Sequence, residues 1–304
     1  MNGLTMKHLR YFDALARIGH FGRAAENCAI SQPALSVQIK ELEELLGAPL
    51  VERGRRRIQL TGLGEAFVGR ARAILRAVDE LSDLGRAVHG PLAGRLRLGV
   101  IPTVAPYLLP GIIKSLNLLY PGLDPRPREA VTHRLIENLT EARLDAAIVA
   151  LPISEPALEE VPLFDEEFVL VRPSEDAAKP VPASDKLHEM RLLLLEEGHC
   201  FRDQALSVCN IAASPTRDLM EGSSLSTLVQ LVGAGIGVTL IPEMAVDTET
   251  RSASVCVSRL TGSRPTRTIG MVWRKTNPLS EQFTLIADIV REAGLKQKQM
   301  NNAK

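Results

Sequence analysis

Long apolar runs are missing from this 304-residue chain, since no stretch approaches the roughly 20 residues that a transmembrane helix needs. The N-terminal stretch MNGLTMKHLRYF also lacks the hydrophobic segment of a signal peptide, so we expect a cytoplasmic protein without membrane association. Cysteine is scarce, with four residues, and standing disulfides are uncommon in the cytosol. A cysteine pair in such a protein is more often catalytic, metal-binding or redox-sensing than structural.

Net charge is absent as well, because 36 Lys and Arg balance 36 Asp and Glu. The balance is uneven along the chain, however, since residues 1–62 carry nine basic and six acidic side chains. Within that segment, four arginines crowd into residues 53–57. Such a cluster suits a polyanion such as DNA, although a solvated charged loop explains it equally well by itself.

The first 62 residues predict three short helices and a ribbon. Apolar residues recur at helical spacing up to Gly19, and a second short helix follows. Ser31 is the expected N-cap of the third helix, with Pro33 just inside its start. The predicted buried stripe of this helix consists of Ala34, Leu35, Ile39, Leu42, Leu45 and Leu46. The tight turn between the second and third helices is typical of a helix-turn-helix, and LVERGRRRIQLT predicts a wing whose turn carries the arginines.

One long amphipathic helix is predicted from about Thr61 to Val88. At 1.5 Å per residue, about 28 residues span about 40 Å, which is longer than one small domain needs. Its apolar stripe suits pairing with a second copy of the chain, and packing on its own domain is the alternative. The breaker-rich segment HGPLAG then predicts a hinge.

Beyond the hinge, apolar strands alternate with helices, which is typical of an α/β domain with a parallel sheet covered on both faces. The predicted strands are RLRLGVI, AAIVAL, FVLVRP, RLLLLE, GVTLIP and TIGMVWR. Ligands in such folds bind where the strands end. The polar tail KQKQMNNAK is expected to fray.

Two cysteines, Cys200 and Cys209, lie nine positions apart in EEGHCFRDQALSVC. Zinc ligation is disfavoured because the pair lacks a C-x-x-C motif and has one nearby histidine, so we expect no metal. Packing accounts for Cys209, which shares a helical face with other apolar residues, better than for Cys200 at a strand–helix junction. The remaining cysteines, Cys28 and Cys256, are expected to be buried small hydrophobes.

The junction position makes Cys200 the expected nucleophile, because the helix dipole and Arg202 would favour its thiolate. If residues 200–209 are helical, the two cysteines lie about 13–14 Å apart. A disulfide needs Cα atoms within about 7 Å, so the segment must unwind before the bond can form, which couples oxidation to refolding. A standing disulfide would instead imply a looped segment and no switch.

A winged helix-turn-helix, a long helix and an α/β effector domain, in this order, resemble a LysR-type transcriptional regulator over essentially the whole chain. The likeness is carried by FGRAAENCAISQPALSVQIKELEELLGAPLVER and TGLGEAF. The segments GVIPTVAPYLLP, EAVTHRLI, VPLFDE, EEGHCFRDQA, GAGIGVTLIPEMAV and RTIGMVWR resemble the peroxide-sensing OxyR branch of that family. No single segment is decisive, but six in order form a specific signal.

This resemblance implies an effector domain like a periplasmic binding protein, with two Rossmann-like subdomains. We divide the chain into a winged helix-turn-helix DNA-binding domain (1–62), a linker or dimerisation helix with its hinge (63–90) and the α/β regulatory domain (91–304). Subdomain I is placed at about 91–163 plus 269–304, and subdomain II at about 164–268.

DNA contacts are expected on the third helix and on the wing. Polar side chains at the start of a recognition helix can reach base edges in the major groove, and wing arginines can neutralise phosphates. The resemblance places the helix contacts at Ser31, Gln32, Pro33, Ser36 and Gln38, and Arg53, Arg55 and Arg56 on the wing are expected to contact phosphates. The alternative is an ordinary exposed polar face. A dimer would present two such helices about 34–36 Å apart.

The expected chemistry is attack of the Cys200 thiolate on hydrogen peroxide, followed by resolution of the sulfenic acid by Cys209. The resemblance places Thr103, Thr132, His199 and Asp203 in the peroxide pocket, with Arg267 as an electrostatic partner. Thr132 is also a candidate N-cap, which is its ordinary alternative.

These observations predict a non-enzymatic activator or repressor of oxidative-stress genes that uses no cofactor. Its expected partners are promoter DNA, a second copy through the long helix and a thiol reductant, and the resemblance further implies a homotetramer and contact with RNA polymerase. Two rival interpretations stay open. One is a LysR-type regulator of a small organic inducer, whose carboxylate the two threonines would contact, and the other is a thiol peroxidase.

Overall fold

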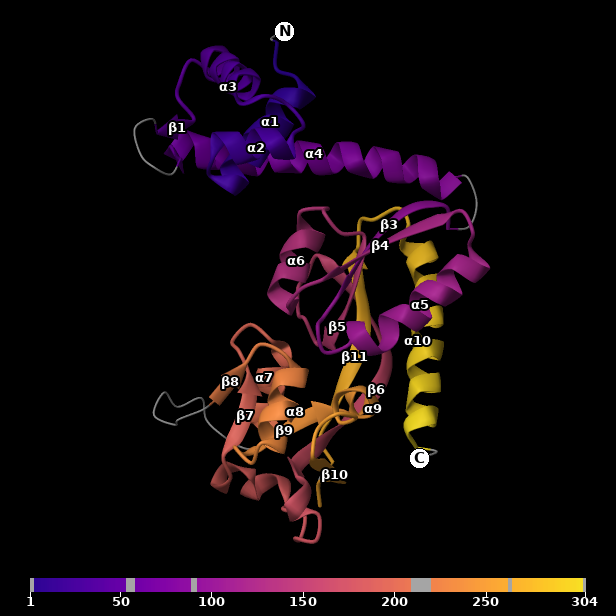
Figure 1. Cartoon of the computed structure of the whole chain (residues 1–304). Helices are drawn as coiled ribbons and strands as arrows, with labels where there is room; N and C mark the ends of the chain where they lie inside the picture. Colours follow the sequence, from indigo (N-terminus) through magenta and orange to yellow (C-terminus); the bar gives the residue numbers. More distant parts are fainter. Residues whose placement is uncertain (1–2, 53–57, 89–91, 209–219, 262–263, 303–304) are drawn as a thin grey trace. The chain divides into compact units, whose positions relative to one another are not determined.

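The computed structural model describes residues 3–52, 58–88, 92–208, 220–261 and 264–302 (Figure 1). The chain divides into two compact units, which we call the N-terminal unit (Met1–Gly85) and the C-terminal unit (Arg86–Lys304). Among the described residues, no helix has both the length and the apolar character needed to span a membrane.

The N-terminal unit is a winged helix-turn-helix, as predicted. Its helices are α1 (Met6–Ile18), α2 (Phe21–Asn27) and α3 (Gln32–Leu46), and its wing pairs β1 (Val51–Glu52) with β2 (Gln59–Leu60). Gly19 ends α1 in a left-handed conformation, with φ 66°, which glycine adopts without steric penalty. The wing turn at 53–57, with the predicted Arg53, Arg55 and Arg56, lies outside the described residues.

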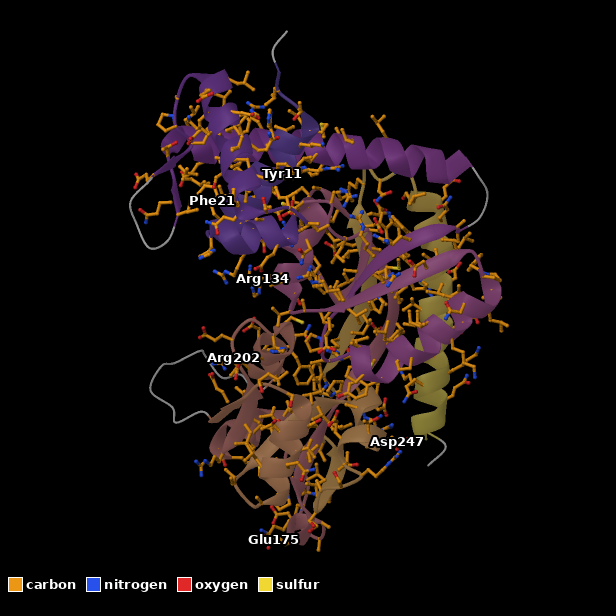
Figure 2. The ribbon with its side chains drawn as sticks, turned by 45° about the horizontal axis from the view of Figure 1, so that its top comes forward. Tyr11, Phe21, Arg134, Glu175, Arg202 and Asp247 are labelled. Carbon is orange, nitrogen blue, oxygen red and sulfur yellow. The ribbon has the colours of Figure 1, made fainter. Side chains whose placement is uncertain are left out.

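Fewer apolar residues of α3 are buried than predicted. Leu35, Ile39 and Leu42 are fully buried, whereas Leu45 and Leu46 are 46% and 38% exposed. The prediction that Leu45 and Leu46 are core residues is wrong, and so is the same prediction for Ala34, which is exposed in the first turn of α3. The aromatic residues Tyr11 and Phe21, labelled in Figure 2, pack partly buried against this core.

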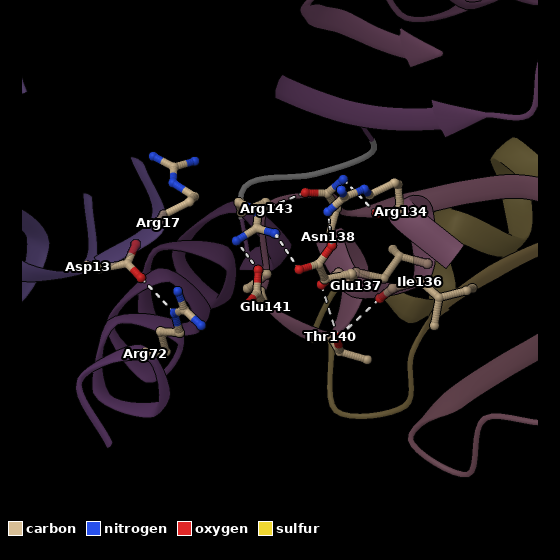
Figure 3. A network of polar contacts seen from close by, with 12 residues as sticks. Asp13, Arg17, Arg72, Arg134, Ile136, Glu137, Asn138, Thr140, Glu141 and Arg143 are labelled. Atoms are coloured by element: carbon tan, nitrogen blue, oxygen red, sulfur yellow. Dashed lines mark hydrogen bonds and ion pairs between the residues drawn. The ribbon is translucent and has the colours of Figure 1, made fainter. Parts of the chain in front are cut away.

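The predicted long helix is present as α4 (Gly62–Val88), with 27 residues. Its first turns pack on the N-terminal unit, where Phe67 meets Phe12 edge-on at 5.5 Å between ring centroids. Arg72 Nε donates to Asp13 Oδ1 at 2.6 Å (Figure 3). Further along, Ile74 and Leu81 are 45% and 66% exposed. The start of α4 therefore packs on its own domain, although Leu63 in its first turn is also 45% exposed.

The C-terminal unit is built on one nine-stranded sheet. Its strands are β3 (Gly94–Val100), β4 (Leu123–Glu129), β5 (Ala146–Leu151), β6 (Leu158–Pro173), β7 (Leu192–Leu195), β8 (Met220–Gly222), β9 (Val238–Pro242), β10 (Val255–Arg259) and β11 (Thr266–Arg274). The spatial order is β4-β3-β5-β11-β6-β9-β7-β8, with β10 paired to β6. All six predicted strands are present.

The expectation of an all-parallel sheet is wrong. Strands β3, β4 and β5 pair in parallel, as do β7, β8 and β9, but β11 and β6 run antiparallel to their neighbours. The long strand β6 takes part in both halves, so the chain crosses between them in extended form rather than through a helix. The pattern LDPRPRE of β4 escaped prediction because prolines are tolerated only where a strand has a free edge.

The helices of this unit are α5 (Ala105–Leu119), α6 (Thr132–Thr140), α7 (Cys200–Val208), α8 (Leu225–Gly233), α9 (Val246–Glu249) and α10 (Ser280–Asn302), with 3₁₀ turns at Ser174–Asp176, Ser184–Glu189 and Glu243–Ala245. They enclose two cores. One is formed from residues 92–163 and 269–290 together with Met244, and the other from residues 168–260. Figure 1 shows α10 running beside α5 and the long strands.

The expected fraying of the C-terminal tail is wrong as far as Asn302, because α10 continues to that residue. Packing explains the persistence of the helix. Gly294 lies directly on the ring of Phe164, and Lys298 Nζ donates to the Asp165 carbonyl at 3.4 Å. Tertiary contacts thus hold a polar segment whose composition alone suggested disorder.

Candidate functional site

Three strand-to-helix junctions of the C-terminal unit meet at one small pocket, which we call the thiol pocket. The segment after β3 leads into α5, the segment after β4 leads into α6, and the segment after β7 leads into α7. The pocket is lined by Ile101, Pro102, Thr103, Val131, Thr132, His199, Cys200 and Phe201. Its side chains lie close together and leave almost no space for a water-sized molecule, so a ligand would need them to move apart.

Four predicted residues, Thr103, Thr132, His199 and Cys200, line this pocket together although the two threonines lie 67 to 97 positions before the other two. Asp203 does not line it and is exposed on the first turn of α7. Cys209 lies outside the described residues.

Cys200 is the first residue of α7, and its thiol is free and half-buried. The next residue, Phe201, is 2% exposed, with its ring 5.0 Å from that of Phe168. The expectation that Arg202 favours the thiolate finds no support, because Arg202 (Figure 2) donates to the Leu195 carbonyl at 3.1 Å and forms an ion pair with Glu221. A helical position two residues on points away from the first residue, so Arg202 serves the packing of α7 on the sheet.

The buried cation behind the pocket is Arg267, which is 4% exposed. Its Nη1 donates to Thr103 Oγ1 at 2.7 Å and its Nη2 donates to the Thr103 carbonyl at 3.1 Å. Its guanidinium also lies over the Phe201 ring, 5.3 Å from the centroid. Arg267 therefore contacts the pocket wall, through Thr103 and Phe201, rather than lining the pocket.

Thr132 is placed differently from the prediction that it caps its helix. The N-cap of α6 is Val131, in an extended conformation, and Thr132 is the first helical residue. Thr132 Oγ1 is buried and has no hydrogen-bond partner among the described residues. A buried hydroxyl without a partner is unfavourable unless a ligand or water completes it.

The far end of α6 is held by a polar network (Figure 3). Asn138 Nδ2 donates to the Arg134 carbonyl and Arg143 Nε donates to Asn138 Oδ1, both at 2.7 Å. Arg134 Nη1 lies 3.1 Å from Glu137 Oε2, and Arg143 also pairs with Glu141. The helix that presents Thr132 is thus anchored by side chains along its length.

His199 lies between the thiol pocket and a larger cavity next to it. Burial lowers the pKa of His199, and the carboxylates of Glu196 and Glu129 oppose that shift. A lowered pKa makes the neutral imidazole the main form near pH 7, in which one nitrogen donates and the other accepts a hydrogen bond.

The DNA-binding candidates lie at the start of α3 in the N-terminal unit. Ser31 Oγ accepts a hydrogen bond from the Ala34 N–H at 3.3 Å, which caps the helix as predicted. Gln32 and Pro33 are exposed, whereas Ser36 and Gln38 are half-buried. Gln38 Nε2 donates to Glu41 Oε2 at 2.6 Å, so this amide would have to leave Glu41 before it could contact a base.

Family models cover both units of the chain. Residues 6–65 match the bacterial regulatory helix-turn-helix proteins of the lysR family, and residues 89–294 match the LysR substrate binding domain. A probable hydrogen peroxide-inducible genes activator from Streptomyces viridosporus is 42% identical over 294 residues, covering 95% of this chain and 94% of the relative. The chain belongs to the LysR family, in its OxyR branch.

Solved OxyR structures resemble this LysR-family chain over nearly its whole length. A cysteine-to-aspartate variant of full-length OxyR from Pseudomonas aeruginosa is 38% identical, with a TM-score of 0.74 and 96% of each chain covered. A cysteine-to-serine mutant of OxyR from Corynebacterium glutamicum, with hydrogen peroxide bound, is 34% identical. Its TM-score is 0.68, covering 98% of this chain and 95% of that one.

Sequence reasoning missed a second cavity of this LysR-family protein, which we call the outer cavity. It has a volume of about 330 Å³, is partly open to solvent and shares Pro102, Thr103, Val131 and His199 with the thiol pocket. Glu249 receives hydrogen bonds there from Tyr107 Oη, at 2.7 Å, and from Ser226. Burial, followed by the contact with Glu249, raises the pKa of Tyr107. The serine-rich segment before α8 was the available sequence signal.

The other two cysteines are half-buried, so the prediction that they are buried core residues is wrong. Cys28 is the C-cap of α2, a position at the helix end rather than on its apolar face, and partial burial raises the pKa of its thiol. Cys256 is on β10, and its thiol donates to the Pro173 carbonyl at 3.4 Å. Over the described ranges, no three His, Cys, Asp or Glu side chains are grouped to hold a metal.

Proposed function

We propose that this protein is a hydrogen-peroxide-sensing transcription regulator of oxidative-stress genes, with Cys200 as the peroxide-reactive thiol. The observation that carries the proposal is the convergence of Cys200, Thr103, Thr132 and His199 in one pocket. The names of its OxyR relatives agree with it, since they describe hydrogen peroxide-inducible activators and a peroxide-bound form.

The reaction needs a thiolate and donors for a departing oxygen. The Cys200 thiolate attacks one peroxide oxygen, a sulfur–oxygen bond forms and the O–O bond breaks. The other oxygen leaves with the bonding electron pair and becomes water with the proton that the thiol had lost. Thr103, Thr132 and His199 supply hydrogen-bonding groups around this centre.

Formation of the Cys200–Cys209 disulfide requires α7 to unwind. Because α7 is helical from Cys200 to Val208, the Cα atoms of Cys200 and Val208 lie about 12 Å apart along the helix axis. One further peptide step of about 3.8 Å leaves Cys209 at least about 8 Å from Cys200. A disulfide needs a Cα separation below about 7 Å, so oxidation and an intact α7 exclude each other.

Unwinding α7 disturbs packing in the second core. Phe201, Ala205 and Leu206 are all buried there. Burial of a large apolar side chain is worth about 1.5–3 kcal/mol, so exposure of Phe201 and Leu206 costs several kcal/mol unless they repack. The disulfide therefore selects a different packing around residues 200–222, which would change how subunits associate.

The N-terminal unit is proposed to bind promoter DNA. Gln32 and Pro33 are exposed at the start of α3, where a recognition helix contacts base edges. We propose contacts from Ser31, Gln32, Pro33, Ser36 and Gln38, and phosphate contacts from Arg53, Arg55 and Arg56.

A homodimer through α4 follows from its exposed apolar residues, Ile74 and Leu81. Pairing of two dimers into a tetramer, contact with RNA polymerase and reduction by a cytoplasmic thiol reductant complete the proposal, and these rest on the family resemblance. Localisation in the cytoplasm agrees with a reversible thiol switch.

The deciding experiment treats the reduced protein with an equimolar amount of hydrogen peroxide, followed by rapid alkylation and peptide mapping. We expect an intramolecular Cys200–Cys209 bond in the wild type. In the Cys209→Ser variant, we expect a trapped sulfenic acid at Cys200. If both thiols remain open to alkylation in the wild type, the peroxide proposal is wrong.

A second candidate function is regulation by a small organic inducer, and the outer cavity favours it because about 330 Å³ exceeds what peroxide needs. Thermal shift of the Cys200→Ser protein against a small-molecule collection tests this candidate without the redox reaction. A third candidate function is that of a thiol peroxidase, and steady-state consumption of peroxide with excess thiol reductant would reveal this activity. A regulator should instead stop after one oxidation per reduction cycle.

A further inference from the structure

Two buried charges lie behind the thiol pocket, and the proposed chemistry above leaves one of them without a role. Glu166 on β6 and Arg267 on β11 are each 4% exposed and are directly paired across the two antiparallel strands. Arg267 Nε donates to Glu166 Oε2 at 2.9 Å, and Nη2 lies 2.8 Å from the same oxygen. The carboxylate therefore holds the guanidinium from two of its three nitrogens.

The Arg267 guanidinium also donates hydrogen bonds to Thr103. Because Nη1 donates to Thr103 Oγ1 at 2.7 Å, the oxygen of this hydroxyl already accepts a hydrogen bond. The hydroxyl has one hydrogen of its own, and that hydrogen must point away from the cation. Thr103 lines both the thiol pocket and the outer cavity, so this donor is available to a molecule bound beside Cys200. Accepting a bond from a cation also strengthens a hydroxyl as a donor.

Both oxygens of Glu166 are used as acceptors. Oε2 faces Arg267, and Oε1 accepts the Met244 N–H at 2.9 Å. Burial raises the pKa of Glu166, and the Arg267 guanidinium and the Met244 N–H oppose that rise. None of the donors facing the carboxyl group can accept a proton, so the geometry accommodates its ionised form. A glutamine at position 166 would have one acceptor oxygen and one donor nitrogen, so it could not accept hydrogen bonds from both Arg267 and the Met244 N–H.

We propose that Glu166 is a positioning residue for the peroxide reaction, acting through Arg267 so that the Thr103 hydroxyl donates to the departing oxygen. This proposal rests on the proposed function. The Cys200 thiolate forms the sulfur–oxygen bond, the O–O bond breaks and the second oxygen leaves as hydroxide. Thr103 stabilises the negative charge on that oxygen until the proton released by the thiol converts it to water.

The test measures two reactions of Cys200 in a Cys209→Ser background. One is sulfenic acid formation with hydrogen peroxide, and the other is alkylation with iodoacetamide, whose iodide leaves without a hydrogen-bond donor. Glu166→Gln should slow the peroxide reaction about tenfold to hundredfold, as expected for one hydrogen bond to a charged group. Alkylation should change less than about twofold, whereas a merely structural loss would slow both reactions.

A double-mutant cycle identifies the residue through which Glu166 acts. Thr103→Val removes the hydroxyl and keeps the shape of the side chain. In that background, Glu166→Gln should have no further effect on the peroxide rate, because the donor it positions is gone. Additive effects of the two changes would overturn the proposal, and so would a wild-type peroxide rate in Glu166→Gln alone.

The matched control is another buried carboxylate paired with arginine. Asp145 is fully buried and accepts from Arg97 Nη2 at 2.6 Å, away from the thiol pocket. Asp145→Asn should leave both rates unchanged. If Glu166→Gln does not fold, Arg267→Lys replaces it, since one ammonium cannot hold Glu166 and both oxygen atoms of Thr103 together, and the same rate pattern is expected.

The outcomes also separate this proposal from the proposed function. Absence of any sulfenic acid in the Cys209→Ser parent would contradict peroxide sensing itself. Normal oxidation of that parent, with an unaltered rate in the folded Glu166→Gln protein, would contradict the positioning role alone.

Discussion

The helices of the N-terminal unit begin with polar caps, whereas two helices at the thiol pocket do not. Thr5 caps α1, His20 caps α2 and Ser31 caps α3, each by accepting a backbone N–H. The N-cap residues of helices α5 and α6 are Val104 and Val131, whose side chains cannot accept a hydrogen bond. The first N–H groups of a helix need partners, and a capping side chain is the usual source.

The difference is not a general property of the C-terminal unit, because Ser224 caps α8 there by accepting from the Thr227 N–H at 3.2 Å. The start of α9 also lacks a side-chain cap, since its N-cap is Ala245, so an uncapped start is not confined to the thiol pocket. At the thiol pocket, the apolar Val131 leaves the start of α6 open beside Cys200. An open helix start is electropositive and suits a developing negative charge.

The largest expected effect comes from Thr132→Val, which removes a hydroxyl from the open end. We expect the peroxide rate of Cys200 to fall about tenfold to hundredfold, because a donor near the reacting oxygens is lost. The unfolding free energy should stay within about 0.5 kcal/mol of wild type or rise, since this buried hydroxyl has no partner among the described residues. Stopped-flow oxidation and urea unfolding check the two quantities. A large loss of stability would mean that the hydroxyl is a structural group.

The second prediction closes the open end with a cap. Val131→Asn supplies an acceptor for the first N–H groups of α6 and should stabilise the C-terminal unit by about 1 kcal/mol. The same amide enters both the thiol pocket and the outer cavity, so the peroxide rate should fall several-fold. Thermal unfolding and the oxidation rate are measured on the same preparation. Val257→Ala, on β10 outside both cavities, is the control for a changed valine.

The third prediction removes a cap from the closed end. Ser31→Ala deletes the acceptor for the Ala34 N–H and should destabilise the N-terminal unit by about 1 kcal/mol. The peroxide rate should remain at the wild-type value, because Ser31 belongs to the other unit. Urea unfolding followed by a probe on the N-terminal unit reports the first effect. A slower oxidation would contradict the separation of roles between the two kinds of helix end.

The smallest effect concerns pH. Burial lowers the pKa of His199 in the folded chain below its ordinary value near 6.5, so the unfolded chain takes up the proton first as pH falls. The stability contributed by the neutral ring is therefore present above about pH 6.5 and is lost as pH falls through the lowered pKa. His199→Gln should flatten this part of the stability profile of the C-terminal unit. The exposed His133, changed to Gln, should leave the slope as it is.

Local rules predicted the positions of most helices and strands well. Gly19, Ser31 and Pro33 set helix boundaries through their own backbone and side-chain chemistry, and the apolar runs after residue 94 became the strands. The failures have tertiary causes. The proline-containing β4 is possible because it lies at the sheet edge, and the polar end of α10 is held by Phe164 and Asp165.

Some residues of the candidate site could likewise be predicted from the sequence, and others could not. The position of Cys200 between a strand and a helix was readable from the pattern around it, and the threonines came from the resemblance. Arg267 also came from the resemblance, whereas the local pattern favoured Arg202, which instead pairs with Glu221 while Arg267 reaches Thr103 across 164 positions. Glu166 and the outer cavity gave no sequence signal strong enough to assign them.

By itself, the sequence determined the order of the two units, the start of the recognition helix and the cysteine spacing that makes an intact helix incompatible with a disulfide. These depend on local backbone preferences and on periodicity, which act over a few residues. Only the tertiary structure decided which hydroxyls meet the thiol, which arginine orients them and which helix ends stay open. Those depend on strands β3, β4 and β7 ending near one another, and on the pairing of β6 with β11, which no local pattern encodes.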